Sequence, residues 1–246
     1  MQKSVCALDR IRVVLSHTFH PGNIGAVARA MKTMGLNRLY LVNPQRFPDV
    51  EATTRATSAV DVLERAVVCA SLDEALQGTI LAAATTSRHR DLSHPSLTPR
   101  AAAPILLSET RHGEVALLFG AETSGLTNSE LDHCQMLLMI PANPDFVSLN
   151  LAAAVQVLAY ELRTALPEAP SPVAEAENRA SLDEIEGFYG HLEQTMTASG
   201  FLDPASPKRL MHRLRRLFAR SRLEREEVNI LRGILTSLAP PGRKQP

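Results

Sequence analysis

Three joints between an apolar run and a helical or loop segment carry polar side chains that could bind or position a ligand, and the first two of them contain glycine. They span residues 21–29, 118–127 and 140–150, and each follows a short apolar run. Backbone N–H groups at a helix start are unpaired and carry the positive end of the helix dipole, so such joints favour polar or anionic ligands. The polar side chains at these joints are Asn23, Arg29, Glu122, Ser148 and Asn150.

The glycine spacing narrows the chemistry of the first two segments. Gly22 and Gly25 do not have the G-x-G-x-x-G spacing of a dinucleotide-binding fingerprint. Gly120 and Gly125 have the spacing of a phosphate loop, but Leu126 stands where such a loop needs its lysine. Without that cation the hydrolysis of ATP or GTP is disfavoured. Dinucleotide and nucleoside-triphosphate enzymes are therefore poor interpretations.

Each joint also has a purely structural interpretation. Gly22 and Gly25 let the backbone approach a ligand, or they belong to a plain loop-to-helix joint with a solvated Arg29. Glu122 is either a ligand-binding carboxylate or a loop residue. Asn150 hydrogen-bonds either a ligand or its own loop.

The third joint opens a long helix. Ser148 is predicted to be its N-cap, and the helix is predicted to run to about Leu166. Its apolar residues cover most of the circumference, which indicates burial against a sheet and against a second subunit.

The elements between these joints predict an α/β fold. Short apolar runs, typical of strands covered on both faces of a parallel sheet, alternate with helical patterns such as the one that ends at Gly35. Strand carboxyl ends share one sheet edge, so the three joints predict a ligand crevice there. The six expected strands are Arg12–Leu15, Leu39–Asn43, Val67–Ala70, Ile80–Ala84, Val115–Phe119 and Met136–Ile140.

The composition changes after residue 166. Residues 167–180 are rich in Pro, Ala and Glu and are predicted to be a linker between a domain at 1–166 and a small all-helical extension at 181–246. Three helical patterns follow, at Ser181–Ser199, Pro207–Ala219 and Arg225–Leu238.

A basic helix is expected at residues 208–222, which hold seven basic and no acidic residues. Leu210, Leu214 and Leu217 with Phe218 are predicted to form its apolar stripe. The cations expected to follow an RNA backbone are Lys208, Arg209, Arg213, Arg216 and Arg220. Alternatively, this helix is exposed and pairs with the acidic segment 183–193.

Composition excludes several other classes. Lys and Arg together number 26, as do Asp and Glu, so the chain carries no net formal charge. The three cysteines are widely spaced, and no His/Cys/Asp cluster has ligand spacing, so we expect neither a disulfide framework nor a metal site. No apolar run is long enough to span a membrane and no secretion signal is evident. We therefore expect a cytoplasmic protein with no membrane contact.

The order and spacing of the three segments resemble motifs one, two and three of the SPOUT-class RNA methyltransferases, in the SpoU/TrmH branch that methylates ribose 2′-oxygens. The matching stretches are 22–31, 119–126 and 140–157. Residues 200–204, 214–220 and 229–234 resemble the C-terminal extension of the tRNA (cytidine/uridine-2′-O-)-methyltransferases of that branch, which modify nucleotide 32 of the anticodon loop. The resemblance implies a C-terminal trefoil knot in the first domain, S-adenosylmethionine as cofactor, tRNA as substrate and a homodimer through that domain.

The resemblance also implies roles for individual residues. Asn23 and Arg29 correspond to the catalytic pair of motif one, and Glu122, Ser148 and Asn150 to the polar positions of motifs two and three. Arg29 is also expected to contact RNA. The stretches that would cradle the cofactor contribute Thr85, Thr86, Ser87, Gly120, Ile140, Val147, Ser148 and Leu149.

A guanidinium group is protonated at neutral pH and is a poor base. We therefore expect Arg29 to clamp a phosphate and polarise the ribose hydroxyl, while Ser148, Asn23 or water relays the proton. Two alternatives stay open: the same chemistry on another tRNA or rRNA nucleotide, and an RNA-binding module that has lost catalysis.

Overall fold

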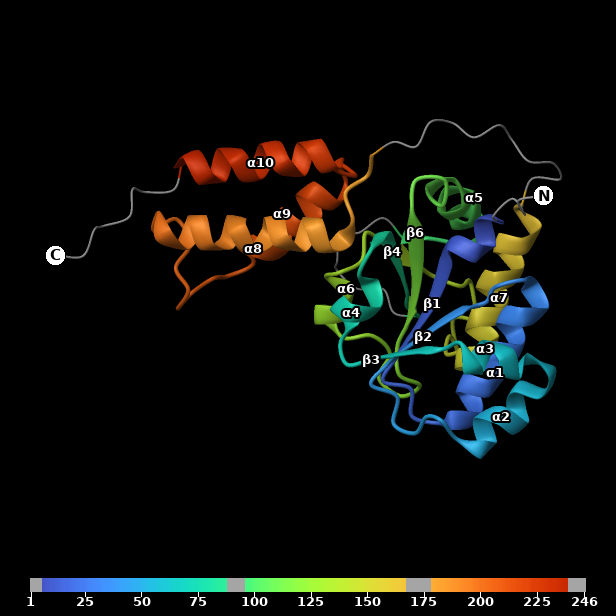
Figure 1. The fold of residues 1–246 in the computed structure, drawn as a ribbon. Helices are drawn as coiled ribbons and strands as arrows, with labels where there is room; N and C mark the ends of the chain where they lie inside the picture. The colour runs from blue at the N-terminus through green and yellow to red at the C-terminus, as the bar shows by residue number, and fades with distance from the viewer. Residues whose placement is uncertain (1–5, 88–95, 167–177, 239–246) are drawn as a thin grey trace. The chain divides into compact units, whose positions relative to one another are not determined.

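The computed structural model describes residues 6–87, 96–166 and 178–238 of the 246-residue chain. The chain divides into two compact units, Met1–Ala176 and Glu177–Pro246, whose elements are labelled in Figure 1. Most of the predicted linker, residues 167–177, lies outside the described residues, as do the last eight residues of the predicted extension.

A parallel sheet forms the centre of the first unit. Within the described residues it has seven strands in the order β3-β2-β1-β6-β4-β7-β5, and every neighbouring pair is parallel. All six predicted strands are confirmed. The short edge strand β5 was not predicted, because two residues cannot form an apolar run. The bounds are β1 Ile11–Ser16, β2 Arg38–Val42, β3 Val67–Cys69, β4 Thr79–Thr85, β5 Ser96–Leu97, β6 Glu114–Phe119 and β7 Met136–Leu138.

Helices cover both faces of this sheet. Figure 1 shows α1, α2, α3 and α7 on one side and α4 and α6 on the other. The predicted α/β class with a parallel sheet is therefore confirmed, whereas the trefoil knot stays a prediction. The helical bounds are η1 Ala7–Arg10, α1 Pro21–Met34, α2 Val50–Ala56, η2 Thr57–Ala59, α3 Val60–Glu64, α4 Leu72–Leu76, α5 Pro99–Glu109, α6 Asn128–Leu131 and α7 Leu151–Thr164.

Helix α1 leads away from the first joint and packs closely against α2. Its buried face repeats at helical spacing, and it ends at Gly35 as predicted. A Cβ atom at Gly25 would lie 2.0 Å from the carbonyl oxygen of Ala52, so only glycine permits this helix contact. The expectation that Gly25 brings the backbone to a ligand is therefore wrong. At Gly22 the neighbouring group also belongs to α2, but it is the side chain of Glu51.

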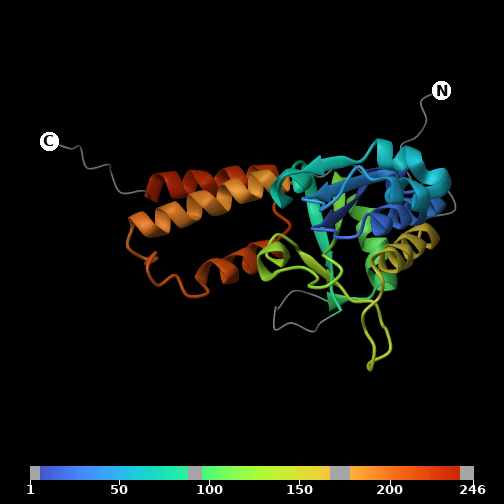
Figure 2. The same cartoon turned by 90° about the horizontal axis from the view of Figure 1, so that it is seen from below.

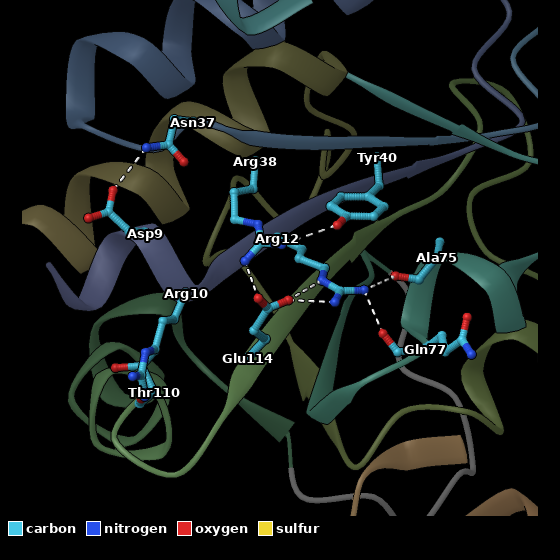
Figure 3. A network of polar contacts seen from close by, with 10 residues as sticks. All are labelled: Asp9, Arg10, Arg12, Asn37, Arg38, Tyr40, Ala75, Gln77, Thr110 and Glu114. Carbon is cyan, nitrogen blue, oxygen red and sulfur yellow. Dashed lines mark hydrogen bonds and ion pairs between the residues drawn. The ribbon is translucent and has the colours of Figure 1, made fainter. Parts of the chain in front are cut away.

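A charged network joins the amino ends of β1, β2 and β6 (Figure 3). The carboxylate of Glu114 on β6 accepts a hydrogen bond of 2.6 Å from Nε of Arg12 and also pairs with Arg38. Nη1 of Arg12 donates to the carbonyl oxygens of Ala75 and Gln77, at 2.9 and 2.8 Å. Arg12 is only 8% exposed, so a charge-paired guanidinium lies inside the unit at the end of the sheet opposite to the joints.

The second unit is a three-helix assembly with its own core. Its helices are α8 (Leu182–Ala198), α9 (Leu210–Ala219) and α10 (Arg225–Leu238), which confirms the three predicted helical segments. Ser181 caps α8 in a capping box with Glu184. The buried core residues are Ala180, Phe188, Tyr189, Leu223, Val228 and Leu235.

The basic helix differs from its prediction in length and, in part, in orientation. Lys208 and Arg222 have φ values of +51° and +49° and lie in turns outside α9, while Arg209 and Arg220 are its N-cap and C-cap residues. The predicted apolar stripe is confirmed in part: Leu210, Leu214 and Phe218 are half-buried, whereas Leu217 is exposed.

The side of α9 that faces the core is set by Phe218, which meets the ring of Phe188 edge-on at 4.9 Å, and by Met211. On the same helix, Arg215 pairs with Glu186 at 2.5 and 2.7 Å. The predicted pairing with the acidic segment is therefore made by Arg215. Within the described ranges, no carboxylate pairs with Arg213, Arg216 or Arg220.

Candidate active site

A hollow of about 280 Å³ opens at the carboxyl ends of β4, β6 and β7. The second and third joints line it, and the first reaches it through a hydrogen bond described below. In Figure 2 the chain between β7 and α7 projects from the unit as a narrow loop. Residues Val147–Leu149 of this loop line the hollow. All eight expected cofactor residues line this hollow: Thr85, Thr86, Ser87, Gly120, Ile140, Val147, Ser148 and Leu149.

The loop after β6 folds back on itself to form one wall. The backbone N–H of Gly125 donates to the carbonyl oxygen of Ala121 at 2.8 Å, and these two residues form an isolated antiparallel bridge. A Cβ atom at Gly120 would lie 2.2 Å from the carbonyl carbon of Gly125 and 2.3 Å from the backbone nitrogen of Leu126. Only glycine at position 120 therefore allows the loop to fold back this closely and form the wall of the hollow.

The lining has the mixed character that a nucleoside-type cofactor needs. Apolar side chains of Phe119, Leu126 and Ile140 provide surface for a flat ring, while the hydroxyls of Thr86 and Ser87 supply polar contacts. Thr85 Oγ1 is buried and has no hydrogen-bond partner within the described residues. Since a buried hydroxyl is normally hydrogen-bonded, this oxygen is suited to a bound ligand. The residues present therefore fit such a cofactor.

A chain of side-chain hydrogen bonds connects the three joints. Asn23 Nδ2 donates to Oε1 of Glu122 at 2.8 Å, and Asn150 Nδ2 donates to Oδ1 of Asn23 at 3.0 Å. These bonds fix both groups of the Asn23 carboxamide. The start of α1, the loop after β6 and the start of α7 are thereby held together.

Glu122 also holds the backbone that precedes α1. Its carboxylate accepts hydrogen bonds from the backbone N–H groups of Phe19, at 2.9 Å, and His20, at 3.2 Å. Burial by itself would raise the pKa of Glu122, but the hydrogen bonds from Asn23 and from these N–H groups outweigh it and lower the pKa below its ordinary value. A carboxylate that is fully engaged and has a lowered pKa is a weak base, so its geometry suits positioning.

The third joint differs from its prediction by two residues. The N-cap of α7 is Asn150, whose Oδ1 accepts from the backbone N–H of Ala152 at 2.9 Å. Ser148 was expected in this role, and that expectation is wrong because the helix begins only at Leu151. The hydroxyl of Ser148 is thus not committed to the helix and lies at the hollow.

Arg29 does not line the hollow. It lies six residues beyond Asn23 on α1, on the order of 9 Å along the helix axis, and it is exposed. An exposed arginine about one and a half turns along α1 from Asn23 is placed to contact a large substrate.

Sequence reasoning missed several lining residues. Phe119, Ala121, Thr123, Ser124, Leu126, Leu151 and Ala154 also line the hollow. Most of them are adjacent in sequence to predicted site residues such as Gly120 and Glu122. Their position in the same loop is the signal that could have identified them as lining residues. Leu151 and Ala154 lie one turn apart on α7, which the helical period could have indicated.

The chain matches two family models. The first is the SpoU rRNA Methylase family, over residues 10–160. The chain belongs to the SpoU methylase family. The second model is the tRNA methyltransferase TrmJ, C-terminal domain, over residues 183–245. The first match covers all three joints of this SpoU methylase, and the second covers the three C-terminal helices that the structure describes.

Similar proteins cover nearly the whole length of this SpoU methylase. It is 51% identical over 240 residues to the tRNA (cytidine/uridine/adenosine-2′-O-)-methyltransferase TrmJ of Pseudomonas aeruginosa, covering 93% of each chain. It is 50% identical over 234 residues to the tRNA (cytidine/uridine-2′-O-)-methyltransferase TrmJ of Pectobacterium atrosepticum, covering 94% of this chain and 97% of that one. The crystal structure of TrmJ from Z. mobilis ZM4 superposes with a TM-score of 0.83 at 32% identity, covering 96% of this chain and 100% of that one.

The described residues contain neither a candidate metal centre nor a helix suited to a membrane. No group of three or more His, Cys, Asp or Glu side chains in the described part of the chain is arranged to hold a metal ion. None of the described helices has the length and apolar character needed to cross a membrane.

Proposed function

We propose that this protein uses S-adenosylmethionine to methylate a ribose 2′-hydroxyl in tRNA. The observation that carries the proposal is the convergence of all eight expected cofactor residues on one hollow, beside the hydrogen-bonded chain Glu122–Asn23–Asn150. Thr85–Ser87, Gly120, Ile140 and Val147–Leu149 would hold the cofactor. When bound, it would supply a methyl group activated by a sulfonium.

The chain's own residues would position the ribose and remove its proton. Asn23 cannot relay that proton, because both groups of its carboxamide are already bonded and an amide is not a base. Ser148 lies at the hollow with its hydroxyl uncommitted to the helix, so we assign the proton relay to Ser148, with water as the final acceptor. Asn23, Glu122 and Asn150 then act as positioning residues.

We assign Arg29 to a phosphate of the RNA. Its distance from the hollow fits a clamp on the backbone next to the methylated nucleotide, not a contact with the hydroxyl. Positioning of this kind supplies a large part of the acceleration in reactions that need alignment.

We further propose that the substrate nucleotide is cytidine or uridine 32 of the anticodon loop, and that the protein acts as a homodimer through its first unit. The two bacterial relatives support tRNA as substrate, since both are named as tRNA 2′-O-methyltransferases. The name of the Pseudomonas relative adds adenosine, so adenosine is the third base to test. The large apolar side chain of Tyr160 on α7 is 50% exposed, which supports a subunit contact on that face.

Incubation of the purified protein with radiolabelled S-adenosylmethionine and unmodified tRNA tests the proposal. We expect label in a nuclease-resistant dinucleotide that begins at position 32, and sedimentation at twice the chain mass of 26.8 kDa. Label at another tRNA position would reassign the substrate. Label in a parallel incubation with rRNA, without label in tRNA, would do the same. Tight RNA binding without label would favour the non-catalytic alternative.

An Arg29→Lys variant is expected to lower kcat/KM for tRNA by about 10- to 100-fold, mainly through KM. Lysine keeps the charge and one hydrogen bond but loses the second of the two parallel hydrogen bonds that a guanidinium makes to a phosphate, which is worth on the order of 1.5–3 kcal/mol. Steady-state methylation at varied tRNA measures this. Arg65→Lys is the matched control, because Arg65 pairs with Asp61 on α3. Wild-type turnover by Arg29→Lys would contradict the clamp.

Combined replacement of Arg213, Arg216 and Arg220 by alanine is expected to weaken tRNA binding and to flatten its salt dependence. Each phosphate contact contributes about 0.7–0.9 to the slope of log K against log salt, so the slope is expected to fall by roughly 2–3. Filter binding between low and moderate salt measures it, with Arg65→Ala as control. An unchanged slope would show that α9 does not contact RNA. The proposed RNA contacts of Lys208 and Arg209 would then be rejected as well.

A further inference from the structure

The loop between β1 and α1, residues 17–20, presents an exposed aromatic side chain beside the hollow. Phe19 is 53% exposed, and its ring meets that of His20 edge-on, with centroids 4.8 Å apart and planes at 81°. The proposed mechanism uses only the backbone of these two residues. A single exposed apolar residue is ordinary on a protein surface. The exposure of Phe19 therefore indicates a function only if its backbone is also fixed beside the site.

Every residue of this loop has its backbone fixed by a partner. The N–H of His17 donates to the carbonyl oxygen of Val42 at 2.9 Å, and the carbonyl oxygen of Thr18 accepts from the N–H of Gln45 at 3.0 Å. The N–H groups of Phe19 and His20 both donate to Glu122. The ring of Phe19 is therefore carried outward on a rigid support, and a partner that binds it orders little additional chain.

The same contacts place the backbone of Phe19 next to a residue that lines the hollow. Glu122 lines the hollow and bonds the backbone nitrogen of Phe19 at 2.9 Å. An RNA strand that offers a ribose to the hollow brings the bases of that nucleotide and its neighbours close to this loop. Unpaired bases stack on aromatic side chains, whereas bases inside a duplex already have both faces covered.

We propose that Phe19, supported by His20, is a stacking platform for an unpaired nucleobase at or next to the methylated nucleotide. This inference rests on the proposed function and adds a base contact that selects loop nucleotides over paired ones. It also separates two roles within one loop: the backbone of residues 19–20 is held by Glu122, and the ring of Phe19 binds substrate.

The first test compares Phe19→Ala, Phe19→Leu and Phe19→Tyr in steady-state methylation of unmodified tRNA. Loss of one stacked base is expected to raise the KM for tRNA by about 5- to 150-fold in the alanine variant. Kcat and the KM for S-adenosylmethionine are expected to stay within about 2-fold. Tyrosine is expected to restore the wild-type KM and leucine to restore only part of it. Val68→Ala is the matched control, since Val68 on edge strand β3 is 52% exposed.

The second test is a double-mutant cycle between Phe19→Ala and tRNA transcripts with a single abasic nucleotide at or beside the target position. Removal of the stacked base is expected to raise the wild-type KM as much as Phe19→Ala does, and to have no further effect in that variant. The proposal is overturned if the KM of Phe19→Ala stays within 2-fold of wild type or if its effect adds to that of every abasic substitution. It is also overturned if the variant changes oligomeric state, which would assign the ring to a subunit contact.

The two proposals fail in different ways. A wild-type protein that transfers no methyl group to tRNA contradicts the proposed function. Filter-binding dissociation constants for tRNA then still compare wild type with Phe19→Ala: weaker binding by the variant supports the stacking platform, and equal binding overturns it.

Discussion

A Gly120→Ala variant is expected to transfer methyl groups at least about 100-fold more slowly than the wild type. The added Cβ atom would lie 2.2 Å from the carbonyl carbon of Gly125 and 2.3 Å from the nitrogen of Leu126, both backbone atoms that no rotamer change can move away. The loop after β6 must shift by about 1 Å, and a misplacement of that size in a positioning site costs on the order of 100-fold. Initial rates at saturating S-adenosylmethionine and tRNA measure the loss.

The matched control is Gly190→Ala on α8, where a Cβ atom would meet nothing within 4 Å. This substitution is expected to leave the rate unchanged and to stabilise its helix by roughly 0.5–1 kcal/mol. Cofactor binding by calorimetry gives a second measurement, because the same loop lines the hollow. A Gly120→Ala enzyme with wild-type rate and cofactor affinity would refute the loop's assignment to the active site.

Replacement of Glu114 by alanine is expected to destabilise the first unit by about 3–5 kcal/mol. Glu114 is the shared acceptor for Arg12 and Arg38, and its removal leaves a guanidinium that is 8% exposed without its carboxylate. Native-state hydrogen exchange of the β1 and β6 amides reports this loss for the first unit specifically.

Asp61→Ala is the comparison, because Asp61 also bonds two cations, Lys32 and Arg65, but on the surface. Exposed pairs contribute little, so a far smaller effect is expected there. If Glu114→Ala and Asp61→Ala lower the free energy of unfolding equally, the burial of Arg12 does not increase the contribution of its ion pair to stability. An Arg12→Leu, Glu114→Leu double variant is expected to recover much of the loss, since apolar replacement removes both charges together.

The architecture was largely predictable from local patterns. The six predicted strands are buried apolar runs, and α1 ends at Gly35 as its spacing required. Apolar runs and helix ends depend on residues that are close together in the sequence, so one sequence is enough to predict them. The convergence of Gly120 and Ile140 on one hollow followed only from the rule that parallel strands bring their carboxyl ends to one edge.

The errors arose where a distant partner decides the outcome. Ser148 and Asn150 are both good N-cap residues, and only the bond from Asn150 to Asn23 selects between them. The orientation of α9 was mispredicted in part for the same reason, because Phe188 and Glu186 on α8 decide which side of it is covered. Gly25 permits a close helix contact with Ala52, and the sequence alone does not distinguish that from a ligand contact.

The bond between Asn23 and Asn150 joins residues 127 positions apart, and the bond between Asn23 and Glu122 joins residues 99 apart. During synthesis, therefore, a ribosome must have released the start of α7 before the active site can exist at all. Any shorter nascent chain exposes the first joint without its partners. Methylation competence is thus acquired late and in one step, and deletion products that end before Asn150 are expected to be inert however well their early strands fold.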